Sequence, residues 1–530
     1  MSDQNTPPSP QFPGQGGPQY PGAGGPQPQQ FQPQQAPYQQ PYEQVQFGAG
    51  QWQQEPPKKQ RGKLIPIVAA LAMVLVVAGG GIFAYGKLNG GKQPDAVLPG
   101  TAIGYLRVDL NPSAGQKLAA LRFLMKFPSV KDKLKLTGDK DDLRQKLFEA
   151  VKSGDDDLKN FDYAKDVEPW LGDRIGVAAL PAADGAKEPG VVVAVQVKDE
   201  KAAAKAMEKG REATEKTGYA FTDGYMLVAE TKAAADSALA AAKAAPLAEN
   251  EKYRADLDKL GEPGFATLWA DFAGIAKLAG EMGPAKLNPV GNGSVAAALR
   301  FDAQYVELKG FVRSDQEIVA KAADASEQVT KLPGTTAAAI SISGAESSID
   351  SVWKNLEKSG EFGDIVQGFA EQTGLKLPDD LKSLLGKNFS VVVDKDASAG
   401  PKIAARLETD PAKAQPVVDK LTALLRQRSA EVPIETASDA DTLVVSTDKE
   451  YAGKVLENGN LGESESFKAA LPDVQGATGI MYVDFDGVNG VAEAVGEKTN
   501  ADLKALRSAG FVARNTGNFE GEFSLRVVAK

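Results

Sequence analysis

Leu98-Pro99-Gly100-Thr101 returns later in the chain as Leu332-Pro333-Gly334-Thr335, and this repetition decides the predicted fold. Further matches keep the same order: Leu171-Gly172 with Leu385-Gly386, Leu227-Val228 with Leu443-Val444-Val445, Leu268-Trp269-Ala270-Asp271-Phe272 with Met481-Tyr482-Val483-Asp484-Phe485, and Ala297-Ala298-Leu299-Arg300 with Phe511-Val512-Ala513-Arg514. The offset is 234 residues from Leu98 to Leu332 but 214 from Leu171 to Leu385, so the first copy has about 20 extra residues, which we place at 137–162. Two copies at this period predict duplicated domains and not a solenoid, whose units are typically about 20 to 50 residues.

Strand and helix signals alternate within each copy. Residues 190–197 place valines 191, 193, 195 and 197 on one face, as a strand packed on one side would. A helix is predicted at 199–217, with Asp199 as N-cap and Gly218 as stop. The later elements predicted in this copy are a strand at 225–230, a helix at 232–243 ended by Pro246, a strand at 265–270, and an antiparallel hairpin at 294–301 and 305–313.

These signals predict an α+β fold of two tandem copies, residues 98–313 and 332–530. Each copy is expected to form one mixed, mainly antiparallel sheet with helices packed on one face, and parallel strand pairs remain possible within it. Residues 314–331 would connect the copies, with a helix over 316–331.

A membrane span is predicted before the first copy. Residues 64–86 carry no charge and are rich in Val, Ala, Leu and Ile, which matches the roughly 20 residues that cross a bilayer as a helix. Four basic residues, Lys58, Lys59, Arg61 and Lys63, precede this run, while only Lys87 and Lys92 follow it closely. By the positive-inside rule, the N-terminus is cytoplasmic and the C-terminal part is extracytoplasmic. A cleaved signal peptide is the alternative, but the long polar leader and long apolar run favour an uncleaved anchor.

The flanks of this span differ in composition. Residues 1–63 hold 13 Pro and 18 Gln and have few bulky apolar side chains. Such a segment cannot bury enough apolar surface to offset the entropy cost of ordering it, so we predict a disordered, proline-rich cytoplasmic tail. Residues 87–97 are a linker. After the span the chain has 56 basic and 67 acidic residues, a net charge of −11 that makes nucleic acid a poor partner.

The absence of His and Cys from the chain limits the chemistry that it can perform. Triads that use His or Cys are excluded, zinc loses its usual ligands, and no disulfide can form. Ser351-Val352-Trp353-Lys354 does read Ser-x-x-Lys, and Lys216-Thr217-Gly218 occurs elsewhere. The penicillin-binding pattern requires the opposite order with Ser-Asp-Asn between, and that is absent. The helical spacing of Ile349, Val352, Trp353 and Leu356 indicates instead that Trp353 is a core anchor.

Acidic residues give no catalytic or metal-binding pair to nominate. The clusters at 138–142 and 154–157 lack the ligand spacing of an EF-hand and are interleaved with Lys, so we interpret them as solvated loops. Asp271 and Asp484 follow an apolar strand in both copies, where they are predicted to cap the next helix while Phe272 and Phe485 enter the core. We therefore predict no catalytic, metal or cofactor-binding residue.

With these motifs in place, the chain resembles the actinobacterial membrane proteins that carry the "domain of unknown function 3352". The resemblance covers roughly residues 97–528. It rests on Leu98-Pro99-Gly100-Thr101, on the Trp170-Leu171-Gly172-Asp173 turn before a strand, and on a Pro/Gln-rich tail followed by one span. It implies location and architecture only, because the family supplies no reaction and no functional residue to carry over.

The sequence favours a single-pass, membrane-anchored, extracytoplasmic binding or interaction module that is not an enzyme. Its partners would be the bilayer, through residues 64–86, and an envelope protein or small molecule. One alternative is an envelope hydrolase or transferase with a carboxylate pair or a Ser/Lys dyad, which predicts polar residues converging in a pocket of one copy and replaced in the other. The other alternative is a structural spacer.

Overall fold

The computed structural model describes residues 92–110, 114–154, 158–182, 189–211, 217–262, 264–282, 291–315, 324–347, 373–427 and 433–530, and the single residues 349, 353, 368, 370 and 371. The predicted tail (1–63), the predicted span (64–86) and linker residues 87–91 lie outside the described residues. Among the helices in the described ranges, none is both long and apolar enough to cross a bilayer.

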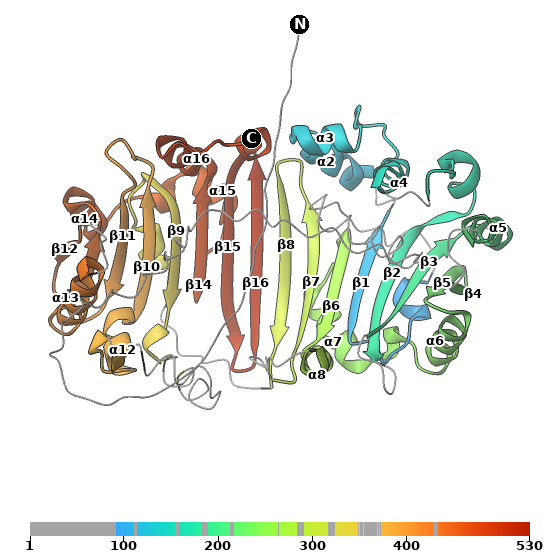
Figure 1. The fold of residues 1–530 in the computed structure, drawn as a ribbon, viewed down its shortest axis with the longest axis horizontal. Helices are drawn as coiled ribbons and strands as arrows, with labels where there is room; N and C mark the ends of the chain where they lie inside the picture. Colours follow the sequence, from blue (N-terminus) through green and yellow to red (C-terminus); the bar gives the residue numbers. More distant parts are fainter. Residues whose placement is uncertain are drawn as a thin grey trace, which may run out of the picture. The chain divides into compact units, whose positions relative to one another are not determined.

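The described strands form one sixteen-stranded sheet (Figure 1), in which every pair between neighbouring strands is antiparallel. The first copy contributes β1 (Gly104–Asp109), β2 (Leu171–Ala182), β3 (Pro189–Val197), β4 (Gly218–Thr222), β5 (Tyr225–Ala229), β6 (Ala266–Asp271), β7 (Ser294–Phe301) and β8 (Tyr305–Arg313). The second contributes β9 (Thr336–Ser343), β10 (Asn388–Asp394), β11 (Ile403–Glu408), β12 (Glu435–Ser438), β13 (Thr442–Ser446), β14 (Gly479–Asp484), β15 (Leu506–Gly517) and β16 (Glu520–Ala529).

Strand order is the same in the two copies. The first copy runs β4-β5-β3-β2-β1-β6-β7-β8, and the second runs β12-β13-β11-β10-β9-β14-β15-β16. The last strands of the copies, β8 and β16, lie side by side and pair from Tyr305↔Val528 to Arg313↔Glu520. The expectation of one sheet per copy was therefore wrong. An edge strand leaves backbone N–H and C=O groups unpaired, and this seam between β8 and β16 satisfies them for both copies.

Helices pack on both faces of the sheet, whereas we expected one face. On the first face lie α2 (Ala114–Leu124), α4 (Leu143–Gly154) and α5 (Glu200–Arg211) in copy 1 and α13 (Pro411–Gln427) in copy 2. On the second face lie α6 (Lys232–Ala244) and α7 (Glu251–Leu260) in copy 1 and α14 (Lys449–Leu456) and α15 (Glu465–Ala470) in copy 2.

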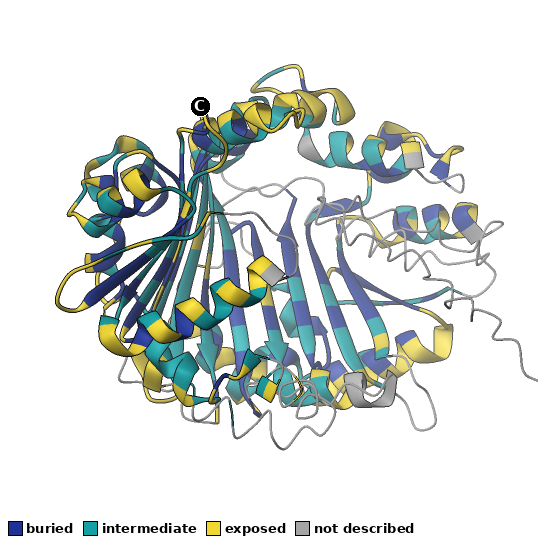
Figure 2. Cartoon of the chain, turned by 60° about the vertical axis from the view of Figure 1, so that its left-hand side comes forward, coloured by how far each residue is buried: buried dark blue, intermediate teal, exposed yellow. Residues whose placement is uncertain are grey.

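Strand β3 explains why both faces are covered. Val193, Val195 and Val197 enter the core of the first face, as their alternation predicts, but Val192 and Ala194 are equally buried on the second face. A strand that is apolar at successive positions must be covered on both sides. Figure 2 shows buried and intermediate residues following one another along the strands.

The remaining helices of the described residues are shorter or lie at strand ends. They are α3 (Pro128–Lys133), α8 (Phe272–Met282), α9 (Ser326–Thr330), α12 (Asp379–Leu385), α16 (Phe485–Ala494), α17 (Ala501–Ala505), a π-helical turn at Tyr163–Val167 and 3₁₀ turns at Pro94–Val97, Leu247–Glu249 and Leu461–Glu463. The predicted connecting helix is reduced to α9 in the described part, and residues 316–323 lie outside it.

Several local predictions are confirmed. The hairpin strands β7 and β8 have the predicted bounds and pair antiparallel. The Asp199 carboxylate accepts a hydrogen bond from the Ala202 N–H (3.0 Å) at the start of α5. That helix ends at Arg211, and residues 212–216 lie outside the described residues.

Candidate functional site

A continuous row of apolar side chains crosses the first face of the sheet from one copy to the other. Each member is the direct register partner of the next, on fourteen successive strands from β5 to β13. We call it the apolar row, and its members are Met226, Val195, Ile175, Val108, Ala266, Leu299, Leu308, Leu525, Phe511, Met481, Ile340, Val391, Ala405 and Val445. Since neighbouring strands lie about 4.8 Å apart, the row is about 60 Å long.

Part of this face is exposed. Six large apolar side chains on the first face are each between 38% and 45% exposed, and we call this surface the open face: Leu268, Ile340, Ile342, Ile403, Met481 and Leu525. Met481 and Ile340 pair directly across β14 and β9. Large exposed apolar patches on soluble proteins often mark a binding site.

The seam strands show which face of the sheet prefers water. On the second face, Arg526 pairs with Glu307 (2.8 Å), and Lys309 lies exposed opposite Ser524. On the first face, the same strands present Leu308 against Leu525. An antiparallel sheet with one wet face packs its apolar face against something else. The seam has this amphipathic pattern, yet Leu525 remains 38% exposed.

Helices border the open face. In copy 1, Leu121 and Phe123 of α2 belong to the same core as Val108 and Phe301, so α2 covers part of the first face there. In copy 2, Ala414 and Val418 of α13 pack with Leu407 and Leu443 at the other side. Figure 1 shows the labelled helices along the margins of the sheet, with β14, β15, β16 and β8 between them.

The segment in which we place the extra residues of copy 1 lines a second apolar feature. A cavity of about 110 Å³ lies under α4, and its floor is formed by first-face side chains that include Ile175, Val195 and Met226 of the apolar row. Its other lining residues come largely from the inserted segment and the turn after it, including Arg144, Leu147, Phe148, Leu158, Phe161 and Trp170. The insertion predicted at 137–162 therefore adds a pocket wall to copy 1.

Charged residues hold the rim of this cavity. Arg144 contacts Asp142 (3.1 Å) and Asp173 (3.5 Å). Burial alone would raise the pKa of Asp142, but the hydrogen bonds and charge of Arg144 outweigh it and hold that pKa below its ordinary value. Burial, with the nearby Asp142 charge, raises the pKa of Tyr163 to about 12. Arg144 is thus committed to two carboxylates, which disfavours a role in binding an anion.

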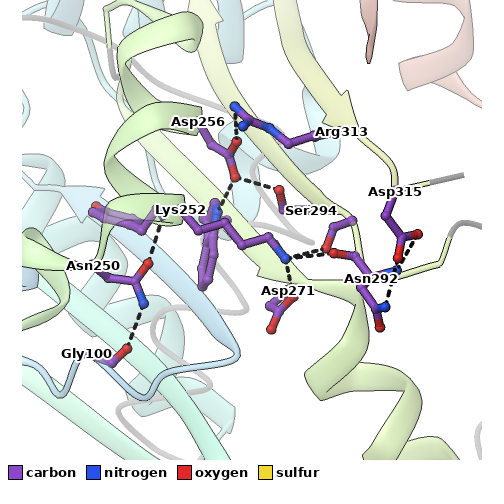
Figure 3. A network of polar contacts seen from close by, with 12 residues as sticks. Gly100, Asn250, Lys252, Asp256, Asp271, Asn292, Ser294, Arg313 and Asp315 are labelled. Atoms are coloured by element: carbon purple, nitrogen blue, oxygen red, sulfur yellow. Dashed lines mark hydrogen bonds and ion pairs between the residues drawn. The ribbon is translucent and has the colours of Figure 1, made fainter. Parts of the chain in front are cut away.

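A buried polar network occupies the second face of copy 1 (Figure 3). The Asp256 side chain is fully buried and accepts hydrogen bonds from the Trp269 indole (2.9 Å) and the Ser294 hydroxyl (2.6 Å). Its other oxygen lies 3.1 Å from the Arg313 guanidinium. These contacts connect α7 to the sheet through a fully buried carboxylate. This buried network was not predicted from the sequence.

The two Asp-Phe pairs have different structural roles. Asp484 caps α16 as predicted, since its carboxylate accepts from the Gly487 N–H (3.0 Å), and it also pairs with Lys395 (2.9 Å). Asp271 instead pairs with Lys252 (2.6 Å), whose ammonium also donates to the carbonyls of Asn292 and Gly293 (Figure 3). The expectation that both phenylalanines enter the core was wrong, because Phe272 and Phe485 are only half-buried.

The other sequence candidates do not assemble a site in the described residues. Ser351, Lys354 and Lys216 lie outside them, and Trp353 is half-buried. In the acidic segment, the Asp141 carboxylate accepts from the Thr137 N–H (2.6 Å) and hydroxyl (2.8 Å) and from the Gly138 N–H (3.1 Å). This carboxylate stabilises its own loop. Residues 155–157 of the second acidic cluster lie outside the described part.

The open face could not be read from any one segment. Each strand contributes one or two apolar residues to it, and only the strand register places them in rows. A partial signal exists in the alternation of the hairpin ends, where Val306 and Leu308, and likewise Leu525 and Val527, alternate with charged or polar residues. Such alternation predicts strands with one wet face, but it does not say that the other face stays open.

Fold and site together define an α+β protein built on one antiparallel sheet, made of two halves with the same strand order and bearing an exposed apolar surface. The chain belongs to the family described as "Protein of unknown function (DUF3352)", which matches residues 67–218 and 209–479. Two matches in one chain support the tandem duplication, although their ends differ from the boundaries of the copies. Neither a curated protein nor a solved structure matches the chain.

Proposed function

We propose that this protein is a membrane-tethered binding module of the cell envelope, in a high-GC Gram-positive bacterium, that takes up an apolar ligand on its open face and has no catalytic role. The observation that carries the proposal is the set of six exposed Leu, Ile and Met side chains on one face of a sheet whose opposite face is charged at the seam. Burying this surface against a ligand would be favourable at about 25 cal/mol for each Å² removed from water.

The tether in this proposal is the uncharged run at residues 64–86, with the basic residues before it on the cytoplasmic side. The folded part would then lie outside the cytoplasm, where its net negative charge disfavours anionic partners such as nucleic acid. The bilayer holds the module in place, and the ligand or an envelope protein is what it binds.

We propose a structural and not a catalytic role for the buried carboxylate of Asp256. One of its oxygens accepts hydrogen bonds from Trp269 and Ser294, and the other lies beside the Arg313 guanidinium. The enzyme alternative predicted polar residues converging in one copy and replaced in the other. The network of Asp256 matches that pattern in its residues, but its carboxylate is fully buried.

The test is native mass spectrometry of the full chain. The protein is purified from its own envelope in detergent, and the detergent is removed in the gas phase. We expect a reproducible adduct of an apolar molecule on the wild type. Leu525→Arg, which places a charge on the open face, should lose it. The matched control is Ser524→Arg, one residue away on the opposite face of β16, which should keep it. An unmodified mass for all three proteins, or equal adducts on all three, contradicts the proposal.

A further inference from the structure

We propose that the open face binds the acyl chains of membrane lipids, laid across the central strands from β6 to β9. This inference rests on the proposed function and specifies its ligand class. Three observations carry it: the composition of the apolar row, the helices that border the open face, and the short connection between the folded part and the uncharged run.

The apolar row favours a long, featureless ligand. Between the bordering helices the row runs from Leu308 to Ile340 over five strands, about 20 Å, without a single hydrogen-bonding side chain. Sites for small ring compounds usually place a few polar groups to fix the orientation of the ligand. A methylene chain needs no such groups, because it can lie in any register along the row.

The neighbouring rows have the same character near the seam. Toward one strand end, Val306, Val527, Ala509 and Val483 are successive register partners on β8, β16, β15 and β14. Toward the other, the successive partners on β8, β16, β15, β14 and β9 are Gly310, Phe523, Ala513, Gly479 and Ile342. Residues two apart on a strand lie about 7 Å apart, so three rows make a strip wide enough for more than one extended chain.

The borders of the open face argue against a flat protein partner. An α-helix is about 10 Å across, and α2 and α13 both stand on the first face, one in each copy. A flexible chain reaches the strand surface between them more easily than the flat surface of a folded protein. The six exposed side chains are also Leu, Ile and Met, whereas the energetic centres of protein interfaces are enriched in Trp, Tyr and Arg.

The chain outside the described part places lipid within reach. The uncharged run ends at Gly86 and the described residues begin at Lys92. Five intervening residues span at most about 18 Å when fully extended. If residues 64–86 cross the bilayer, the folded part stays beside the outer leaflet, where lipid is the most abundant apolar molecule. Lys92 pairs with Asp223 in the turn between β4 and β5, at the edge of the sheet in copy 1, so the sheet has to lie along the membrane for lipid to reach the open face.

The experiment is photo-crosslinking of the full chain, reconstituted in phosphatidylcholine vesicles that contain a small fraction of phosphatidylcholine with a diazirine in the middle of one palmitoyl chain. After irradiation and digestion, we expect labelled peptides from β9, β14, β15 and β16. Leu525→Arg should lower this labelling at least about tenfold, because a guanidinium is costly to place against methylene groups. Ser524→Arg should leave the labelling unchanged.

A second series tests the chemical class of the ligand. Diazirine lipids with chains of 8, 12 and 16 carbons should label the open face to within about twofold of one another, since their methylenes are out of water both in the bilayer and on the protein. Replacing the choline headgroup by glycerol at constant chain length should change labelling less than about twofold, because the row contacts chains only. If Leu525→Arg fails to fold, judged by its circular dichroism, Leu525→Gln replaces it and should lower labelling in the same direction.

Label confined to residues 64–86 overturns the inference, because the lipid would then contact the anchor alone. Crosslinks between two copies of the chain through β15 and β16 also overturn it, in favour of self-association. Either result leaves the proposed function standing if the native mass spectrum still shows an apolar adduct that Leu525→Arg removes. The failure of the two proposals is therefore distinguishable.

Discussion

The two copies share a strand order but differ in what they bury on the second face. In copy 1, the fully buried Asp256 of α7 bonds Trp269, Ser294 and Arg313. The residues at the corresponding positions of copy 2 are Ala470, Tyr482, Ser508 and Val528. The correspondence follows from the register: Ser294 pairs with Asp271 and Arg313, and Ser508 pairs with Asp484 and Val528.

Copy 2 retains the aromatic packing of copy 1 on this face but not its buried ion pair. Tyr253 and Trp269 meet edge to face with centroids 5.5 Å apart, and Phe467 and Tyr482 occupy the same places in copy 2 at 5.1 Å. The apolar contacts that hold the helix on the sheet are common to both copies, so they are sufficient for the fold. The buried ion pair is an addition in copy 1, consistent with the finding that such pairs often add little beyond a well-packed apolar equivalent.

The largest expected effect is at this ion pair. Asp256→Ala leaves the Trp269 indole, the Ser294 hydroxyl and Arg313 without their acceptor, which should lower the free energy of unfolding by about 3 to 5 kcal/mol. Urea unfolding followed by tryptophan fluorescence measures it. Asp258→Ala, an exposed residue on the same helix, is the control and should change little.

A double variant sharpens the comparison by giving copy 1 the residues of copy 2. Asp256→Ala with Arg313→Val should recover part of the loss, because it removes the unpaired charge together with its partner. A double variant less stable than Asp256→Ala alone would show that Arg313 stabilises copy 1 through other contacts.

The second effect concerns the seam. Gly310 occupies the position of copy 1 that corresponds to Leu525 in copy 2, and a Cβ there would lie 2.1 Å from the Phe523 ring. Gly310→Val should therefore destabilise the protein by about 1 to 3 kcal/mol through overpacking. Adding Phe523→Ala should relieve much of this in urea unfolding. Gly517→Ala, where a Cβ meets nothing within 4 Å, is the control.

A smaller difference is expected between the two Asp-Phe pairs. Asp484→Ala removes a helix cap and the ion pair with Lys395, and should lower the free energy of unfolding by about 1 to 2 kcal/mol. Asp271→Ala removes an ion pair whose Lys252 keeps two carbonyl partners, so a loss below about 1 kcal/mol is expected. Thermal unfolding of the two variants, measured side by side, compares their losses of stability. Equal losses would contradict the different roles assigned to Asp484 and Asp271.

The smallest effect is a pH dependence limited to copy 1. Burial raises the pKa of Asp95 above its ordinary value of 3.8, more than the hydrogen bond from the Tyr253 hydroxyl (2.8 Å) lowers it. The native state therefore holds this proton to higher pH than the unfolded state, and stability falls as the pH rises from about 4 through the raised native pKa. In copy 2 the corresponding residue is Val329, which does not titrate.

Asp95→Asn tests this sign. The variant keeps an acceptor for Tyr253 but cannot ionise, so it should match the wild type near pH 3 and exceed its stability at pH 7, by on the order of 1 kcal/mol or less. Urea unfolding at both pH values provides the measurement. A variant that is less stable than the wild type at pH 7 would mean that the ionised carboxylate, through Arg107, stabilises the fold.

Local structure was predictable where the signal is local. The bounds of β7 and β8, the alternation of β3 and the cap at Asp199 all depend on residues close together in the chain. The duplicated order of elements was also predictable, because both copies repeat short motifs in sequence. These features lead to the α+β class and to two copies without any knowledge of tertiary contacts.

The joining of the sheets and the candidate site were not predictable in this way. Strands β8 and β16 pair although they are more than 200 residues apart in the sequence, and no local signal in either strand predicts its partner. Asp256 looks like an exposed helical residue in sequence, since charged residues surround it, although its spacing from Tyr253 and Leu260 places all three on the buried side of α7. The open face exists only when the register of many strands is known.

The seam also dictates an order of events while the chain is synthesised from its N-terminus. Copy 1 completes its own eight strands early, but the outer edge of β8 has no partner until β16, the last strand of the sheet, arrives. During that interval an unpaired amphipathic strand is presented to other emerging chains, which is the circumstance in which edge strands associate wrongly. The folding of this protein is thus most vulnerable just before its final strand is synthesised.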